Sequence, residues 1–522
     1  MTEAISPLPR REQHAEDVST LARGSGVTFL GGGLSFAVGA LAQLLVARFL
    51  GPQRLGIYSI GRAITQIGTQ VAPLGLSSAV IYYAARHWKT ETAKLRDVLV
   101  QSIGATLVSG LIFFGLLYLS APWIALRVFH DSALTHVLRM LSPAIAIFPA
   151  LRVAKQATGV SFRMQYRVYI DLAGSVSFIA IFLAFLLWGG PLRAAVLAYV
   201  GSTALGLVVA CYFLRRLFAD AFSDHTRPEF ILPTLFAYAL PAFLSALFTA
   251  PLESSDRLIV GYFCPANQVG LYQAASQAAT AVGVGLFTVG AIAAPMIANL
   301  YSRGEIDRLS ELFRVSTKWV FYFGLVAFLL MASEPRVVMT FLYGRKFHLG
   351  GTALVILSFG RLIDAAAGSA RAMLLLTGHQ NRLLRITSFT LVLQIVLSVI
   401  LTPRFGIAGA ASARALATLA VATISLIAVK TSLGLWPYDA RYLKGLLAAA
   451  VTGVLLLASH HIPLHSAPLR LALAAVVSAG TFTALLMITG LDEEDWHVFS
   501  MVQRRLRRSG LAIGLGGDAR GQ

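Results

Sequence analysis

Long apolar runs separated by short polar segments are the dominant pattern of this 522-residue chain. Most runs are close to 20 residues long, the length of α-helix that crosses a hydrocarbon core of about 30 Å. The runs are continuous and do not alternate, which favours membrane-spanning helices over the strands of a β-barrel. The pattern predicts fourteen spans: 27–49, 57–84, 98–120, 134–154, 168–188, 193–214, 232–257, 270–298, 315–333, 350–376, 384–402, 406–429, 441–459 and 468–490.

A repeated corner follows the first and the seventh predicted spans. The stretch "ARFLGPQRLGIYSIGRA" has a weaker copy, "GYFCPANQVGLYQAASQ", in which Gly56 aligns with Gly270 and Tyr58 with Tyr272 at an offset of 214 residues. Gly-Pro and Gly-x-Tyr are typical of a tight turn between helices. The tyrosine is expected at the membrane interface, with its ring in lipid and its hydroxyl group in water.

A second pair of segments extends the repeat. "KTETAKLRDVL" and "RGEIDRLSELF" align at the same offset of 214, beyond an intervening apolar span in each copy. Six spans per copy is an even number, so both copies enter the membrane in the same direction. This predicts a pseudo-two-fold axis along the membrane normal and a space between two lobes. Chance alignment of similar helix compositions is the alternative at this low identity.

The predicted fold is therefore an all-α polytopic membrane protein with two pseudo-symmetric six-helix lobes and two further carboxy-terminal helices. The first 26 residues lack the apolar stretch of a signal peptide and are expected to form a tail. The expected regions are a cytoplasmic tail at 1–26, an amino-terminal lobe at 27–219, a carboxy-terminal lobe at 230–430, two spans at 431–490 and a cytoplasmic basic amphipathic tail at 491–522.

The distribution of charge indicates how the chain lies in the membrane. A net charge of +19 would suit a nucleic-acid partner, but only 13% of the residues are charged, about half the fraction in soluble proteins. With the amino terminus inside, the predicted cytoplasmic loops hold twenty Lys and Arg residues, and the outer loops and helix ends hold eleven. An excess of Lys and Arg in cytoplasmic loops is typical of membrane proteins. We therefore expect both termini in the cytoplasm and no nucleic-acid partner.

Four arginines lie inside predicted spans: Arg62, Arg361, Arg371 and Arg414. A charge at mid-bilayer costs roughly 2.5–3.5 kcal/mol, so such side chains usually face a polar interior. On a helix, Arg62 shares one face with Gln66 and Thr69, and the opposite face is apolar. We interpret this stripe as part of a substrate cavity; the alternative is that Arg62 snorkels to the interface. In the second copy, Ser276 occupies the position of Arg62.

The tenth span carries the strongest group of ionisable residues. Arg361, Asp364, Gly368 and Arg371 share one face of a continuous helix. The i,i+3 spacing allows Arg361 and Asp364 to pair, which would leave Arg371 as the net positive charge. Arg361, Asp364 and Arg371 are therefore substrate-binding candidates, with an internal ion pair that locks helix packing as the alternative.

Four further ionisable residues lie near span ends. Glu253, Asp256 and Arg257 are close to the outer end of span seven, where they either gate the mouth of a cavity or face water. Asp171 begins the fifth span near the cytoplasmic Arg167, and a stabilising acid at a helix start is favoured over a proton carrier. We treat these four as candidates for gating or ion coupling.

Motifs of enzymes and metal sites are missing from the sequence. It contains no nucleophile elbow, no Walker loop and no zinc-protease helix. Its two cysteines, Cys211 and Cys264, provide neither a disulfide framework nor a metal site. We expect no enzyme activity, no cofactor and no metal, with turnover driven by an ion gradient or the membrane potential.

Three segments carry a resemblance to a known family. "ARFLGPQRLGIYSI", "LESSDRLIVGYF" before "VGLYQAA", and "TPRFGIAGAASARAL" resemble the polysaccharide-export branch of the multidrug/oligosaccharidyl-lipid/polysaccharide flippases, and the likeness extends from about residue 25 to 490. The resemblance implies two six-helix lobes around an alternately opening cationic cavity. By position, Arg62, Arg361 and Arg371 are similar to basic cavity residues of that family.

The function that the resemblance implies is transport of undecaprenyl-diphosphate-linked oligosaccharide across a bacterial inner membrane, from the cytoplasmic to the periplasmic leaflet, for O-antigen or exopolysaccharide synthesis. Expected partners are this lipid-linked oligosaccharide, membrane lipids and other polysaccharide-assembly proteins. One alternative is a drug/cation antiporter of the same superfamily, which would need acidic cavity residues. Another is a membrane-embedded glycosyltransferase or polymerase, which would need a large outer loop carrying carboxylates or histidines.

Overall fold

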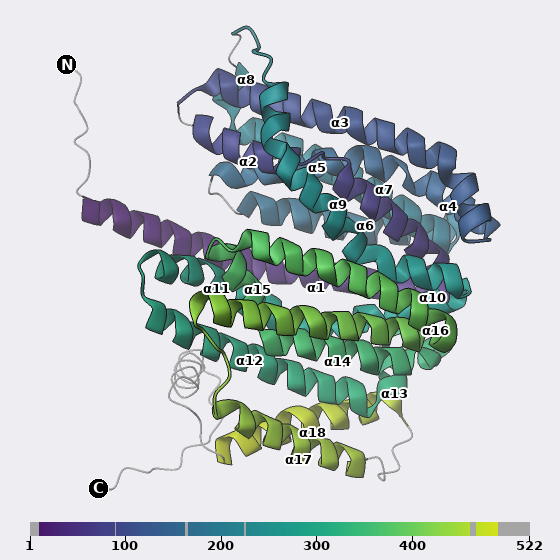
Figure 1. Ribbon diagram of the computed structural model, residues 1–522. Helices are drawn as coiled ribbons and strands as arrows, with labels where there is room; N and C mark the ends of the chain where they lie inside the picture. Colours follow the sequence, from purple (N-terminus) through teal and green to yellow (C-terminus); the bar gives the residue numbers. More distant parts are fainter. Residues whose placement is uncertain (1–9, 89, 162–164, 224–225, 460–465, 489–522) are drawn as a thin grey trace, which may run out of the picture.

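The computed structural model describes residues 10–88, 90–161, 165–223, 226–459 and 466–488, and every regular element within them is helical (Figure 1). The amino-terminal half contains α1 (Arg10–Val71), α2 (Leu76–His87), α3 (Thr92–Trp123), η1 (Ile124–Val128), α4 (Ser132–Leu141), α5 (Pro143–Thr158), η2 (Gly159–Ser161), α6 (Gln165–Gly189), α7 (Pro191–Leu217) and α8 (Ala219–Ser223). The carboxy-terminal half contains α9 (Leu232–Phe263), α10 (Ala266–Ala279), η3 (Thr280–Gly283), α11 (Val284–Ser302), α12 (Ile306–Ser333), α13 (Pro335–Tyr343), η4 (Arg345–Gly350), α14 (Gly351–Ala367), α15 (Ala370–Leu376) and α16 (Gln380–Leu433), followed by α17 (Arg441–Ser459) and α18 (Ala467–Ile488).

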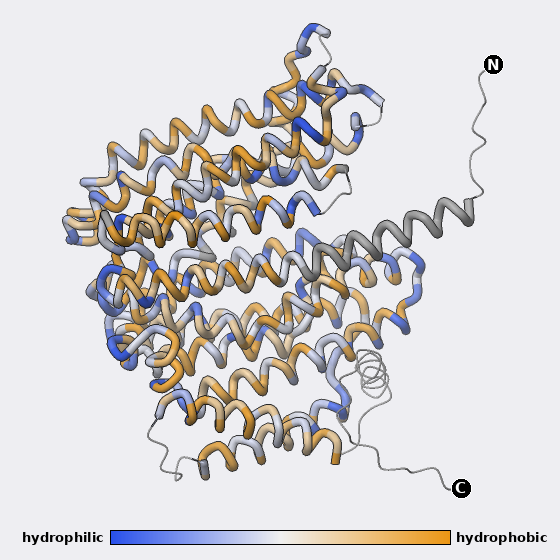
Figure 2. The backbone as a smooth tube through the Cα atoms, turned by 180° about the vertical axis from the view of Figure 1, so that it is seen from behind, coloured by the Kyte–Doolittle hydropathy of each residue, from blue (hydrophilic) through white to orange (hydrophobic). Residues whose placement is uncertain are grey.

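The expectation of a polytopic all-α membrane protein is confirmed. Within the described ranges, eleven helices are long and apolar enough to cross a membrane. The outward surface along their length is rich in large apolar side chains, such as Leu119 and Leu187, whereas polar positions gather at the two ends of the bundle (Figure 2). The count of fourteen spans stays a prediction.

Two of the eleven helices turn back on themselves at glycines. Gly51 in α1 has φ 68° and Gly406 in α16 has φ 57°, values in the left-handed region that favours glycine. Arg62 Nη1 donates to Gln43 Oε1 at 2.8 Å, although the two residues are 19 positions apart. In a straight helix that separation would be about 28 Å, so the two passes of α1 lie side by side. The Gly-Pro corner therefore ends the first pass, as its sequence indicates.

The expected continuous helices over 57–84 and 350–376 are both broken in the structure. α1 ends at Val71, before Pro73, and the chain turns through Leu74 (φ 51°) and Gly75 (φ 76°) before α2 begins. A Cβ atom on Gly75 would lie 2.1 Å from the Ala239 carbonyl oxygen, so α9 packs directly on this break. The second break is at Gly368 (φ 55°), between α14 and α15.

The ends of the chain differ partly from expectation. α1 begins at Arg10, so residues 10–26, assigned to a tail by their polarity, continue the first helix. This stretch is rich in Arg, Glu, Gln, Ala and Leu, which favour helix without requiring burial. The rest of the tail at 1–9 and the basic amphipathic tail at 491–522 lie outside the described residues.

The bundle has two distinct ends, and each half contributes to both. We call the end that holds Gly51 and Gly406 the corner end; α4, α10 and α13 lie there in Figure 1, and α2, α8 and α11 lie toward the opposite end. α2 to α8 form one group of helices, and α10 to α16 form another, with α17 and α18 packed outside α12 (Figure 1). α1 packs against α6 of the first group and α10 of the second, so it joins the two groups.

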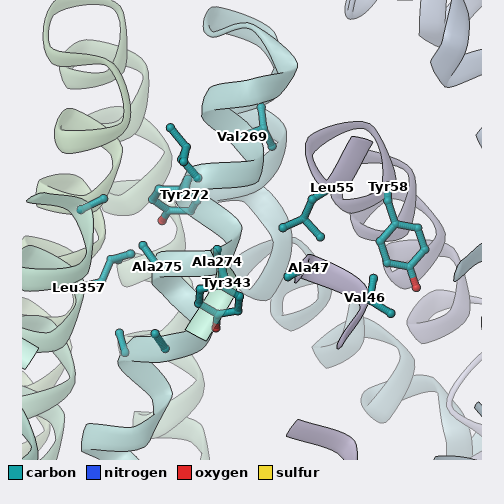
Figure 3. Close-up of a cluster of buried hydrophobic side chains, with 14 of the residues drawn as sticks. Val46, Ala47, Leu55, Tyr58, Val269, Tyr272, Ala274, Ala275, Tyr343 and Leu357 are labelled. Carbon is teal, nitrogen blue, oxygen red and sulfur yellow. The ribbon is translucent and has the colours of Figure 1, made fainter. Parts of the chain in front are cut away.

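The two copies of the repeated corner contribute to one buried cluster at the corner end (Figure 3). Tyr58 is 2% exposed and Tyr272 is fully buried. Both were expected at the membrane interface; that prediction is wrong, because both tyrosines are buried inside the helix bundle. The Tyr272 hydroxyl donates a hydrogen bond to Asp256 Oδ2 at 3.0 Å.

Candidate functional site

A cavity of about 590 Å³ opens among α1, α5, α6 and α7 in the amino-terminal half. Gln66 and Thr69, from the polar stripe that begins at Arg62, are on its wall. The charged side chains around it are four cations and one carboxylate: Arg62, Arg152, Lys155, Arg167 and Asp171. The cavity therefore has a formal charge of +3. We call it the amino-terminal cavity.

Arg62 is held in this cavity by groups from two other passes. Its Nη1 donates to Gln43 Oε1 in the first pass of α1. Its guanidinium lies over the ring of Tyr199 from α7, with Cζ 5.3 Å from the ring centroid, an arrangement that attracts a cation to the face of the ring. A guanidinium has five N–H donors. Gln43 takes one of them, which leaves further donors for a ligand.

The other members of the predicted stripe differ in what they offer. The Thr69 hydroxyl donates to the Gln66 carbonyl oxygen at 2.9 Å, within its own helix, and Thr69 is only 2% exposed. Gln66 is partly exposed on the cavity wall. The stripe thus contributes a guanidinium and an amide, and the hydroxyl group satisfies the helix backbone.

The charges away from Arg62 lie where α5 ends and α6 begins, at the opposite end of the bundle. Asp171 of α6 forms an ion pair with Lys155 of α5, and their side chains are 40% and 25% exposed. Arg152 and Arg167 line the same part of the cavity. We call this group the mouth cluster. The helix-start acid of the sequence prediction therefore has a defined partner, and that partner is Lys155.

The tenth-span residues surround a second, smaller cavity in the other half. This carboxy-terminal cavity measures about 40 Å³ and is lined by Arg361, Asp364, Arg414, Ser276 and Thr418, among others. The structure does not bring Arg361 and Arg62 into one cavity: the two groups line separate spaces.

The expected pairing between Arg361 and Asp364 is replaced by another. Arg371 Nη2 donates to both oxygens of Asp364, at 2.7 and 2.9 Å. The sequence interpretation assumed one continuous helix, but the left-handed Gly368 separates α14 from α15 and turns Arg371 back toward the acid. Asp364 is thus neutralised by Arg371, and Arg361 remains as the cation beside the cavity.

Asp256 neither faces water nor lies at a cavity mouth. It is 1% exposed, and its carboxylate accepts hydrogen bonds from Arg414 Nη1 of α16, from the Tyr272 hydroxyl of α10 and from the backbone N–H of Arg257. Arg257 Nε is also within 3.7 Å. This carboxylate therefore joins α9, α10 and α16 inside the carboxy-terminal half. The side chain of Glu253 lies outside the described residues.

Comparisons with known proteins agree with this fold. The sequence profile of the polysaccharide biosynthesis protein family matches residues 21–301, and that of the MatE family matches residues 241–400. An uncharacterized membrane protein of Methanocaldococcus jannaschii is 26% identical over 186 residues, which is 35% of this chain and 36% of that protein. The match thus spans about a third of that relative's length.

Two solved structures have the same fold. A lipid II flippase, MurJ, in an inward closed conformation superposes with a TM-score of 0.72 at 13% identity, covering 88% of this chain and 98% of the flippase. An inward-facing multidrug resistance MATE family transporter superposes with a TM-score of 0.64 at 18% identity, covering 76% of this chain and 94% of the transporter. With more than half of its residues matching the family profile, the chain belongs to the polysaccharide biosynthesis protein family, in the multidrug/oligosaccharidyl-lipid/polysaccharide flippase superfamily of multi-pass membrane transporters.

Proposed function

We propose that the protein moves an undecaprenyl-diphosphate-linked oligosaccharide from the cytoplasmic to the periplasmic leaflet of a bacterial inner membrane by alternating access. The observation that carries the proposal is the charge of the amino-terminal cavity, where four cations face one carboxylate. That carboxylate, Asp171, is already paired with Lys155. The cavity wall is therefore suited to an anionic headgroup.

Such a wall lowers the main barrier to this transport, which is the transfer of a charged headgroup through hydrocarbon. A diphosphate is anionic and strongly hydrated, so its passage through hydrocarbon is prohibitively costly. A polar cavity with fixed cations replaces its hydration shell while the polyprenyl chain stays in lipid. Arginine suits this role because its planar fork binds phosphate oxygens through two hydrogen bonds and does not deprotonate. Arg62, held by Gln43 and Tyr199, supplies one such fork.

The size of the cavity favours the headgroup and the first sugars. About 590 Å³ lies within the range of sites that enclose a small organic molecule. The neutral part of the wall includes Gln66, Gln70, Ser202 and Thr203, whose amides and hydroxyl groups can both donate and accept hydrogen bonds, as sugar hydroxyls do. The carboxy-terminal cavity, at about 40 Å³, is too small for the same ligand. We therefore assign the headgroup to the amino-terminal cavity in this conformation.

The loop charges support the orientation that this direction of transport requires. The excess of Lys and Arg in alternate loops supports a cytoplasmic location for the opposite end of the bundle and for both chain termini. The mouth cluster lies at that end, so it would meet the diphosphate first, and Arg62 would meet it deeper in the cavity. Outward release then requires the corner end to open.

The antiporter alternative is less well supported. A transporter of organic cations needs carboxylates that are available to the cation. Among the residues that the structure describes, the aspartates within predicted spans 168–188, 232–257 and 350–376 each pair with a basic side chain: Asp171 with Lys155, Asp256 with Arg414 and Asp364 with Arg371.

A deletion strain separates the functions. Deleting the gene in its native host should raise the amount of lipid-linked oligosaccharide, keep it on the cytoplasmic leaflet, and abolish surface polysaccharide until the wild-type gene is restored. Lipid extraction measures the amount, and labelling of intact spheroplasts measures the sidedness. An unchanged lipid pool together with reduced efflux of cationic dyes would favour the antiporter. A reduced pool would favour a glycosyltransferase or polymerase.

A further inference from the structure

Arg361 is a half-buried guanidinium beside a small cavity inside the carboxy-terminal half. It extends from α14 past η3, where a Cβ atom on Gly283 would lie 3.9 Å from its Cδ. Among the residues that the structure describes, none forms a hydrogen bond or an ion pair with it. An arginine in this position within a membrane-spanning helix calls for a counter-charge.

The two carboxylates near Arg361 already pair with other side chains. Asp364 accepts two hydrogen bonds from Arg371, and Asp256 accepts from Arg414 and from Tyr272. Arg257, Arg361, Arg371 and Arg414 set against Asp256 and Asp364 leave a formal charge of +2. A buried charge that lacks a partner is strongly destabilising, so this group of six favours a bound anion beside Arg361.

The dimensions of the cavity decide what kind of anion it takes. A volume of about 40 Å³ accommodates a few water molecules at most, since one needs about 10–15 Å³ on this measure. A chloride or nitrate ion fits, and a sugar diphosphate does not. The Ser276 hydroxyl on the wall is a second donor beside the guanidinium. We propose that the carboxy-terminal cavity binds a small monovalent inorganic anion, chloride being the abundant one, between Arg361 and Ser276.

The internal repeat accounts for the place of this site. Ser276 aligns with Arg62 at the offset of 214 residues, and each lines the cavity of its own half. In the amino-terminal half this position carries the guanidinium itself. In the carboxy-terminal half it carries a hydroxyl group, and α14 supplies the guanidinium. The two halves thus place anion donors at equivalent positions around cavities of very different size.

Thermal unfolding of the purified full-length protein tests the site without its transport substrate. Chloride replaces gluconate stepwise at constant ionic strength, and the midpoint temperature is followed. A ligand that binds only the folded state raises this midpoint with concentration. We expect a saturable rise for wild type and for Arg345→Gln, which removes an exposed arginine at the corner end, and a lost or much reduced rise for Arg361→Gln. No rise in wild type, or an equal rise in Arg361→Gln, would overturn the proposal.

Three further measurements keep the site distinct from the transport cavity. Arg62→Gln should retain the chloride-dependent rise, and its loss there would assign the anion to the amino-terminal cavity instead. Ser276→Val fills the small cavity while keeping every charge, so it should abolish the rise even if Arg361→Gln does not fold. In crystals of wild type soaked in bromide, an anomalous peak should lie beside Arg361. Bromide peaks confined to other places would contradict the assignment.

Discussion

Gly56 and Gly270 meet backbone to backbone across the two halves at the corner end. A Cβ atom on Gly56 would lie 1.7 Å from the Ala266 carbonyl oxygen, and one on Gly270 would lie 1.8 Å from the Pro52 carbonyl oxygen. These are the two glycines that the internal repeat aligns. Each copy of the repeated corner thus contributes a glycine where the backbones of the two halves pack directly against one another.

Replacing Gly270 with alanine should therefore force α1 and α10 apart. Overpacking of this kind typically costs about 1–3 kcal/mol. Unfolding of the purified protein in mixed micelles measures the change. Gly104→Ala in α3 is the matched control, because a Cβ atom there would meet nothing within 4 Å. Alanine at that helical position should be neutral or stabilise by up to about 1 kcal/mol. Equal stability of the two variants would refute the close contact.

The buried ion pair between Asp256 and Arg414 predicts strong coupling. Asp256→Ala leaves a guanidinium without its partner, at a cost of about 3–5 kcal/mol. Arg414→Leu removes one donor from a carboxylate that keeps Tyr272 and Arg257, so it should cost less. The double variant should cost clearly less than the two single costs added together. Tyr272→Phe removes one hydroxyl donor from the charged carboxylate and should cost about 1.5–3 kcal/mol. Unfolding free energies of the four variants form the test, and simple additivity would show that the pair does not stabilise the fold.

The arrangement around Arg62 predicts that a near-isosteric change weakens substrate binding. Gln43→Glu keeps the shape of the side chain that accepts from Arg62 and adds a negative charge beside the guanidinium. Affinity for the lipid-linked diphosphate should fall about ten-fold or more, since ten-fold corresponds to about 1.4 kcal/mol. Binding of the lipid to purified protein in nanodiscs provides the readout. Unchanged affinity would remove Arg62 from the binding site.

A change in the mouth cluster is expected to raise the affinity for the lipid-linked diphosphate, the opposite of the effect of Gln43→Glu. Asp171→Asn keeps the side-chain shape, frees Lys155 and raises the formal charge of the amino-terminal cavity from +3 to +4. Affinity for the same lipid should rise, and the gain should shrink at high salt because part of this cluster is exposed. The same nanodisc assay run at two salt concentrations checks this. If Asp171→Asn instead abolished transport while binding stayed normal, Asp171 would be a coupling residue.

Sequence patterns were sufficient to predict the features that depend on neighbouring residues alone. Helices, the Gly51 corner and the membrane character follow from apolar run length and from Gly-Pro. The prediction that Arg361 and Arg371 share one helix face was wrong, because the left-handed Gly368 between them ends the helix. Periodicity assumes an unbroken helix, and the sequence does not show where one breaks.

Contacts between helices that are distant in the chain could not be predicted from the sequence for a different reason. Asp256 and Arg414 are 158 residues apart, so neither residue indicates the other. Arg152, Lys155 and Arg167 fell among the cytoplasmic loop charges that set topology, although the structure places them on the wall of the amino-terminal cavity. The available sequence signal for a role in the cavity was their position within one or two turns of a span end. The positive-inside rule already explained basic residues there, so that position did not indicate a cavity.

Flipping of a fluorescent undecaprenyl-diphosphate-linked oligosaccharide in proteoliposomes tests the central proposal most directly. Wild type and Arg404→Gln, which removes an exposed arginine at the corner end, should move the lipid at similar rates. Arg62→Gln should insert and fold normally yet lose most of the activity, because the deepest cation of the cavity is gone. Flipping by Arg62→Gln at the wild-type rate would contradict the idea that this cavity carries the diphosphate.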